Sequence, residues 1–245
     1  MTSARRRVLG LAVPALGALA AEPLFVMADS AIVGHLGTAP LAGLALAGVI
    51  LDTCVYLCVF LAYATTAGVA RAFGAGNLHD AARRGIDALW LALGLGLGVG
   101  LVLFWFARPV LGWFQPDAAV LAAAFEYLRW SAPGLPAMLV VLAAVGVLRG
   151  LQNTRVTLAV ALAGGLVNAA VSVVLCYPAG LGIRGAALGT VISQVGMALW
   201  AAGLVAALAR RAGAALTPHP SGVGEAARAG APLFVRTCCL RAAGL

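Results

Sequence analysis

Long apolar stretches, separated by short polar or Gly/Pro-containing connections, set the pattern of this chain. Apolar runs of about 18 or more residues are typical of membrane-spanning helices. The pattern predicts spans at residues 8–34, 40–70, 82–107, 118–150, 156–178 and 184–209, and a further apolar stretch begins near Ala226. Segments of alternating polarity, which would indicate a transmembrane barrel, are not found. The expected fold class is therefore all-α: a polytopic membrane protein with a six-helix transmembrane bundle and the start of a seventh helix.

The composition excludes a water-soluble globular protein. Hydrophobic residues make up 63% of the 245 residues and charged residues only 10%, whereas soluble domains carry about 25% charged residues. The net charge of +8 comes from 16 arginines, and lysine is absent. Because the arginines cluster between apolar spans, membrane orientation explains them better than nucleic-acid binding. The lipid bilayer is the expected partner, and no nucleic-acid partner is expected.

The distribution of arginines predicts how the chain is oriented. One set of connections is rich in arginine: Arg5, Arg6, Arg7, Arg71, Arg83, Arg84, Arg149, Arg155, Arg210 and Arg211. The alternating connections hold only Arg108 and Arg184. Cytoplasmic loops of membrane proteins carry the excess of positive charge. We expect a multi-pass protein of the cell (inner or plasma) membrane with a cytoplasmic N-terminus. A cleaved signal ending near Ala20 is the alternative, but apolar character continues to Val33, which is too long for such a signal.

Two acidic residues lie in the first predicted span. An acid at the centre of a spanning helix costs roughly 2.5–3.5 kcal/mol on insertion scales, so its default interpretation is functional, in carrying a proton or cation. Glu22 and Asp29 are two helical turns apart and face nearly the same side. Pro14 and Pro23 lie in the same span and permit bending. The competing interpretation is an acid that is simply hydrogen-bonded to its neighbours.

Polar residues in the fifth and sixth spans could accompany these acids. Asn168 and Ser172 are four residues apart and share a helix face, and the sixth span holds Thr190, Ser193 and Gln194. Their oxygens suit a proton relay or a sodium ion. Each could instead join helices by hydrogen bonds. The choice depends on whether they face Asp29.

Two local patterns predict packing. Gly94, Gly96, Gly98 and Gly100 alternate along the third span, which indicates either close helix approach or flexibility. Glu126 is followed three residues later by Arg129, which predicts a local ion pair.

No pattern points to an enzyme. The chain has no nucleophile elbow, no H-E-x-x-H motif and no phosphate-binding G-x-x-x-x-G-K-[ST] loop. The five cysteines lie among apolar residues, and no histidine or carboxylate lies at the spacing from them that a metal site needs. We expect no enzymatic activity, no metal and no cofactor, apart from a transported proton or sodium ion.

Three motifs resemble one transporter family. The first is Pro14…Glu22-Pro23-Leu24…Asp29…Gly34-His35-Leu36-Gly37, followed by Leu41-Ala42; the second is the segment 149–155 (RGLQNTR); the third is the segment 182–187 (GIRGAA) followed by Thr190. In this order they resemble the multidrug and toxic compound extrusion (MATE) family, in its DNA-damage-inducible branch. The resemblance covers about 200 residues.

The resemblance implies two six-helix lobes, alternating access, and export of large, often cationic organic compounds against inflow of protons or sodium. It implies that Asp29 is the coupling acid and Pro14 the bending proline. Asn168, Thr190 and Tyr127 match the cation-site network of the family. Many members carry an aspartate where this chain has Ser172, which favours a proton coupled mainly through Asp29.

The resemblance also divides the chain. Residues 1–209 match the N-terminal lobe, residues 210–225 a cytoplasmic linker between lobes, and residues 226–245 the truncated start of a second lobe. The expected function is a cation-coupled antiporter represented by its N-terminal half, with a second transporter lobe as its partner and small organic substrates. The alternatives are a membrane fragment that is inert or depends on assembly, and a related lipid-precursor flippase. A flippase should line its cavity with basic residues, and the predicted spans contain almost none.

Overall fold

The computed structural model describes the backbone of residues 2–243, and the side chains in that range except residues 2–12, 14, 15, 18, 19, 22, 238 and 240–243. The described part consists of helices and contains no strand, so the expected all-α class is confirmed. The helices are α1 (Thr2–Gly34), α2 (Thr38–Leu57), α3 (Phe60–Gly74), α4 (Leu78–Gly112), α5 (Ala118–Ser131), the 3-10 turn η1 (Ala132–Gly134), α6 (Leu135–Gly150), α7 (Thr154–Cys176), α8 (Ile183–Arg211) and α9 (Pro220–Ala243).

The helices reproduce the predicted spans. In the described residues, five helical segments are long and apolar enough to cross a membrane: Thr38–Gly74, Leu78–Gly112, Ala118–Gly150, Thr154–Cys176 and Ile183–Arg211. The described apolar part of α1, Pro23–Gly34, is shorter. The protein is therefore a multi-pass membrane protein built from a helix bundle.

Two of the predicted spans are interrupted, which the hydrophobic pattern did not indicate. The second divides into α2 and α3, where Cys58 and Val59 donate to the carbonyls of Val55 and Tyr56 three residues back. This tighter bonding ends one helix and starts the next without leaving the apolar stretch. The fourth span divides at η1, which contains Pro133, because a proline cannot donate the helical hydrogen bond.

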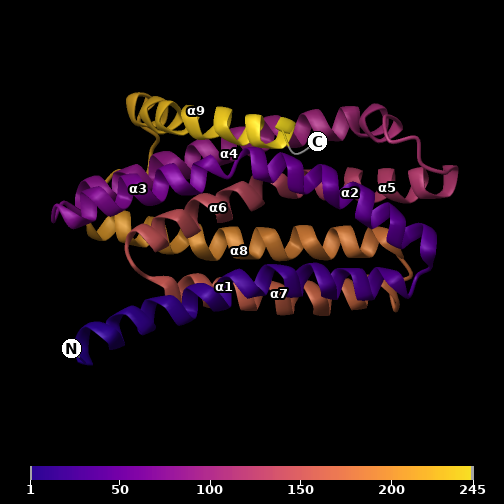
Figure 1. Cartoon of the computed structure of the whole chain (residues 1–245), viewed down its shortest axis with the longest axis horizontal. Helices are drawn as coiled ribbons and strands as arrows, with labels where there is room; N and C mark the ends of the chain where they lie inside the picture. The colour runs from indigo at the N-terminus through magenta and orange to yellow at the C-terminus, as the bar shows by residue number, and fades with distance from the viewer. Residues whose placement is uncertain (1, 244–245) are drawn as a thin grey trace.

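The helices run roughly along one axis (Figure 1). Helix α7 packs mainly against α1 and α8, α4 against α6, and α2 against α5. Helix α1 changes direction along its length, so that its N-terminal part slants away from the bundle while the rest follows α7 (Figure 1). Helix α9 crosses the outside of α3 and α4. It begins at Pro220, inside the segment that the sequence assigned to the linker.

The alternating glycines of α4 divide into two kinds. A Cβ on Gly96 would lie 2.9 Å from the backbone nitrogen of Pro136 and 3.1 Å from the carbonyl oxygen of Leu135, and Gly100 is similarly tight against Ala132. Gly94 and Gly98 have nothing within 4 Å. Close helix approach therefore explains one face of the run, where α4 meets η1 and α6.

The predicted ion pair between Glu126 and Arg129 is wrong. Glu126 accepts a hydrogen bond from Arg184 at the start of α8, while Arg129 lies over the rings of Phe104 and Phe125, 5.1 and 5.8 Å from their centroids. Arg129 thus finds an aromatic partner across the helix interface, and Glu126 joins α5 to α8.

Candidate functional site

A buried carboxyl group joins three helices in the interior of the bundle. Asp29 of α1 is only 6% exposed. Its Oδ1 accepts a hydrogen bond from Asn168 Nδ2 of α7 at 3.0 Å. Its Oδ2 lies 3.4 Å from Thr190 Oγ1 of α8. Burying a carboxyl group costs free energy unless its oxygens are hydrogen-bonded, and both oxygens of Asp29 have such partners here.

The amide of Asn168 is held from its other side by a second residue of α7. Ser172 Oγ donates to Asn168 Oδ1 at 2.8 Å, and both side chains are almost fully buried. Since the amide oxygen accepts from Ser172, its nitrogen is directed at Asp29. The four-residue spacing predicted this shared face, and the structure shows that it is the face turned to α1.

Thr190 has two acceptors for a single hydroxyl proton. Its Oγ1 lies 3.0 Å from the carbonyl oxygen of Ala186 and 3.4 Å from Asp29 Oδ2. A hydroxyl group donates one hydrogen bond and can also accept. Thr190 can therefore donate to Asp29, or donate to Ala186 and accept from a protonated Asp29.

Tyr127 of α5 completes the cluster. It is 4% exposed, and its side chain lies close to those of Thr190 and Asp29. Four helices thus contribute to one polar cluster, which we call the Asp29 cluster: Asp29, Asn168, Ser172, Thr190 and Tyr127.

Close packing of α7 on α8 keeps the cluster compact. Gly189 of α8 lies directly against Ser172, with a would-be Cβ 2.9 Å from its backbone nitrogen. Tyr177, directly after α7, donates to the carbonyl oxygen of Ile32 at 2.7 Å, which ties the end of α1 to the end of α7.

The other polar residues singled out in the sixth span lie elsewhere. Ser193 donates to the backbone of Thr190 at 2.9 Å, and Gln194 lies 3.4 Å from the sulfur of Met138. The Ser193 bond thus stays within α8, and the Gln194 contact joins α8 to α6; neither bond is made to Asp29.

The remaining predicted site residues lie in α1. The side chains of Glu22 and Pro14 fall outside the described residues, and Pro23 is exposed. Helix α1 is continuous through both proline positions, and the change of direction noted above lies within this helix. Among the described residues, no group of three or more His, Cys, Asp or Glu side chains is arranged to hold a metal ion.

Sequence reasoning missed a second buried acid. Asp87 of α4 is 3% exposed, and its Oδ1 accepts from the backbone nitrogen of His219 at 2.8 Å, just before α9. The residue lies three positions after Arg84, near the start of the third predicted span, and nothing in the sequence indicates its contact with His219, 132 residues away.

A helix bundle with apolar outer faces and a polar cluster at its centre defines a multi-pass membrane protein with an intramembrane polar site. The family model described as MatE matches residues 14–174. The chain belongs to the MatE family, which includes proteins named as multidrug resistance proteins.

Several relatives show the same similarity. The chain is 33% identical over 200 residues to Protein DETOXIFICATION 44, chloroplastic, of Arabidopsis thaliana, covering 76% of this chain and 38% of that protein. It is 32% identical over 198 residues to DNA damage-inducible protein F of Escherichia coli, covering 79% and 42% respectively. Multidrug resistance protein PmpM of Pseudomonas aeruginosa is 31% identical over 176 residues, covering 70% and 36%.

Solved structures share the fold. An outward-facing multidrug resistance MATE family transporter of the MOP superfamily superposes with a TM-score of 0.81 at 22% identity, covering 95% of this chain and 53% of that one. A MOP superfamily transporter from Pyrococcus furiosus gives 0.83 at 21% identity, covering 95% and 52%. The chain thus spans less than half the length of these curated relatives and about half of the solved chains.

Proposed function

We propose that this chain is the coupling half of a multidrug efflux antiporter, in which Asp29 takes up and releases the proton that drives export by alternating access. The observation that carries the proposal is the Asp29 cluster itself. One oxygen of Asp29 faces the amide donor of Asn168, and the other faces the Thr190 hydroxyl, which can either donate or accept. The acid therefore has hydrogen-bond partners in both of its protonation states. Intramembrane acids of this kind mark proton and ion pathways in transporters.

Thr190 supplies the element that responds to protonation. With Asp29 charged, the Thr190 hydroxyl donates to the carboxylate. With Asp29 neutral, the carboxylic acid donates to Thr190, which turns its own proton to the carbonyl of Ala186 at 3.0 Å. The bond between α1 and α8 therefore changes its direction and strength with the charge of Asp29, because hydrogen bonds to ionised groups are the stronger kind.

The donor set favours a proton over sodium as the coupling ion. A sodium ion needs several oxygen ligands directed at one point. Here the amide oxygen of Asn168 accepts from Ser172, and its nitrogen, which cannot ligate a cation, faces Asp29. Ser172 also offers no second carboxylate. The cluster therefore has one negative charge, which a single proton neutralises.

The substrates we propose are small organic compounds, often cationic, and the partner is a second transporter lobe. The similarity to the multidrug resistance proteins PmpM and NorM supports multidrug export, and the coverage of about half of each solved chain supports a second lobe. The arginine distribution supports a cytoplasmic N-terminus in the cell membrane. The polar cluster carries an acid and no arginine, which argues against a flippase for anionic lipid precursors.

The test is proton-driven uptake of a fluorescent organic cation into proteoliposomes. The chain is reconstituted alone and together with a separately expressed C-terminal lobe of a MatE-family transporter, and Asp29→Asn is compared with Asp117→Asn, an exposed acid outside the cluster. We expect Asp29→Asn to abolish pH-driven transport and Asp117→Asn to retain it. Unchanged transport by Asp29→Asn would refute the coupling role. Absence of transport under both conditions would instead establish an inert fragment.

A further inference from the structure

A polar cavity lies between α3, α4 and the start of α9, and none of the residues of the Asp29 cluster lines it. Its volume is about 270 Å³. Three arginines and three acids line it: Arg71, Arg83, Arg84, Asp80, Asp87 and Glu225. These six charges sum to zero. What the cavity can bind therefore depends on which of the charged groups already form ion pairs.

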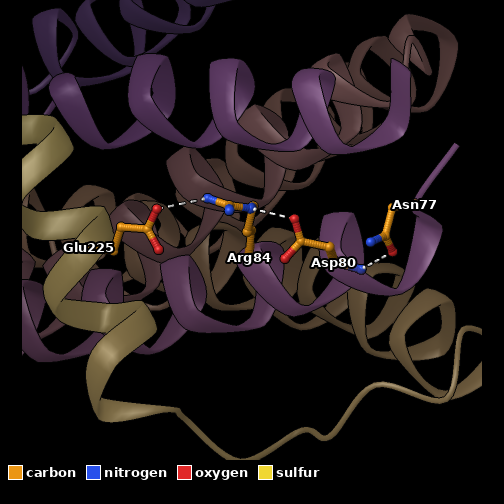
Figure 2. A network of polar contacts seen from close by, with 4 residues as sticks. All are labelled: Asn77, Asp80, Arg84 and Glu225. Atoms are coloured by element: carbon orange, nitrogen blue, oxygen red, sulfur yellow. Dashed lines mark hydrogen bonds and ion pairs between the residues drawn. The ribbon is translucent and has the colours of Figure 1, made fainter. Parts of the chain in front are cut away.

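One arginine is shared between two of the acids. Arg84 donates from Nε to Asp80 at 2.9 Å and from an η nitrogen to Glu225 of α9 at 3.4 Å. Figure 2 shows this bridge, with Asn77 capping the same helix at the backbone nitrogen of Asp80. Both carboxylates of the bridge are therefore engaged with one guanidinium group.

The third acid is committed to α9. Asp87 is 3% exposed and accepts from the backbone nitrogen of His219. Its other oxygen lies so close to Gly222 that no Cβ could be accommodated there. A carboxylate at a helix N-terminus is stabilised by the unpaired N–H groups and the helix dipole. Asp87 thus contacts the start of α9, and among the described residues it forms no ion pair with an arginine.

Two guanidinium groups remain. In the described part of the chain, neither Arg71 nor Arg83 has a carboxylate within ion-pair distance. Both line the cavity, with Arg71 in the last turn of α3 and Arg83 in the second turn of α4. The six charges of the cavity sum to zero, but Arg71 and Arg83 are the two guanidinium groups in it that contact no carboxylate among the described residues, and the complement of these two groups is an anion.

The cavity lies at the depth of a membrane interface. Phe73 is 41% exposed and Trp90 is 45% exposed, two residues after Arg71 and two helical turns after Arg83 respectively. Aromatic residues of this kind mark the level of lipid headgroups. Trp90 also donates from its indole nitrogen to the carbonyl oxygen of Leu216 at 3.0 Å, which anchors the connection before α9.

We propose that this cavity binds a phosphate group through Arg71 and Arg83, and that its source is the headgroup of an anionic phospholipid. The planar guanidinium group of arginine can donate two parallel hydrogen bonds to phosphate oxygens, and basic pockets between membrane helices bind anionic headgroups. The volume of about 270 Å³ lies below the roughly 300–1,000 Å³ of drug-sized sites, so it admits a headgroup while the acyl chains follow the apolar outside of α3 and α4. The site is independent of the proton-coupling proposal.

Native mass spectrometry of the detergent-solubilised chain tests the proposal. The wild type, Arg71→Gln/Arg83→Gln and the matched control Arg149→Gln/Arg155→Gln are each mixed with phosphatidylglycerol or with zwitterionic phosphatidylcholine. The control removes the same charge from exposed arginines outside the cavity. Arg71→Lys/Arg83→Lys keeps both positive charges but removes the guanidinium groups. Circular dichroism of every variant distinguishes loss of binding from loss of folding.

We expect phosphatidylglycerol to bind the wild type at least about tenfold more tightly than the Gln double variant, because two charge-assisted bonds are lost. The control should match the wild type and the Lys variant should lie between. If inorganic phosphate binding depends on Arg71 and Arg83 while phosphatidylglycerol binds no more tightly than phosphatidylcholine, the lipid source is refuted in favour of a soluble phosphate. Equal phosphatidylglycerol binding by wild type and the folded Gln variant would overturn the site.

Discussion

Replacing Gly189 by alanine should disturb both the stability of the bundle and the geometry of the Asp29 cluster. A methyl group on Gly189 would lie 2.9 Å from the nitrogen and 3.0 Å from the Cα of Ser172, and closer still to its hydroxyl oxygen. Ordinary carbon contacts lie at about 3.5–4.0 Å. Because two of the opposing atoms belong to the backbone, a rotamer change cannot relieve the contact. Helices α7 and α8 must separate locally.

The expected cost of this overpacking is about 1–3 kcal/mol in the free energy of unfolding. For a chain of this size that is a fall in Tm of about 2–12 °C. Gly196 is the matched control on the same helix, since a Cβ there has nothing within 4 Å. Gly196→Ala should leave Tm unchanged or raise it slightly, because alanine favours helix by about 0.8–1.0 kcal/mol.

A thiol-reactive dye measures the unfolding in detergent. Cys58 and Cys176 are buried and become labelled only as the bundle opens. Gly189→Ala should also reduce pH-driven transport by more than the loss of folded protein accounts for, because a displaced Ser172 no longer orients Asn168. Equal melting of Gly189→Ala and Gly196→Ala would refute the packing argument for α7 and α8.

Three further outcomes follow from the same contacts. Gly96→Ala should lower Tm and Gly98→Ala should not, since only Gly96 abuts the backbone of Pro136; equal effects would show that flexibility explains the glycine run. Asn153→Ala removes the cap that accepts from the first turn of α7 and should cost about 0.5–2 kcal/mol, read as a lower Tm, whereas an unchanged Tm would contradict it. Ser172→Asp adds a carboxylate beside Asn168 and should make transport sodium-dependent; transport that stays independent of sodium would argue against our account of ion choice.

Hydrophobic pattern alone predicted where the spans lie, because crossing a membrane requires length and apolarity that are visible in sequence. It could not predict the break between α2 and α3 at Cys58, since no proline, glycine or polar residue marks it. That break arises from local three-residue bonding inside an apolar run. The division at Pro133 had a visible cause, although it leaves the length of the apolar stretch unchanged.

Helical spacing predicted one contact within a helix correctly and another wrongly, and it gave no contact between helices. Asn168 and Ser172 were placed on one face by their spacing, and they are hydrogen-bonded. Glu126 was assigned to Arg129 by the same logic, but its partner is Arg184, 58 residues away. The encounter of Asp29 with α7 and α8 likewise depends on tertiary packing, and only family resemblance anticipated it.

The position of α1 bears on the proposed role of Asp29 in taking up and releasing a proton. One side of this helix is exposed, with Leu24 61% and Met27 67% accessible, and its extensive packing in the bundle is against α7. Packing of this kind does not depend on charge. The bonds from Asp29 to Asn168 and Thr190 do, because a carboxylate binds these donors more strongly than a carboxylic acid. Protonation of Asp29 would therefore weaken the polar part of the attachment of α1 while leaving its apolar contact with α7 intact, which lets the helix shift along the bundle without leaving it.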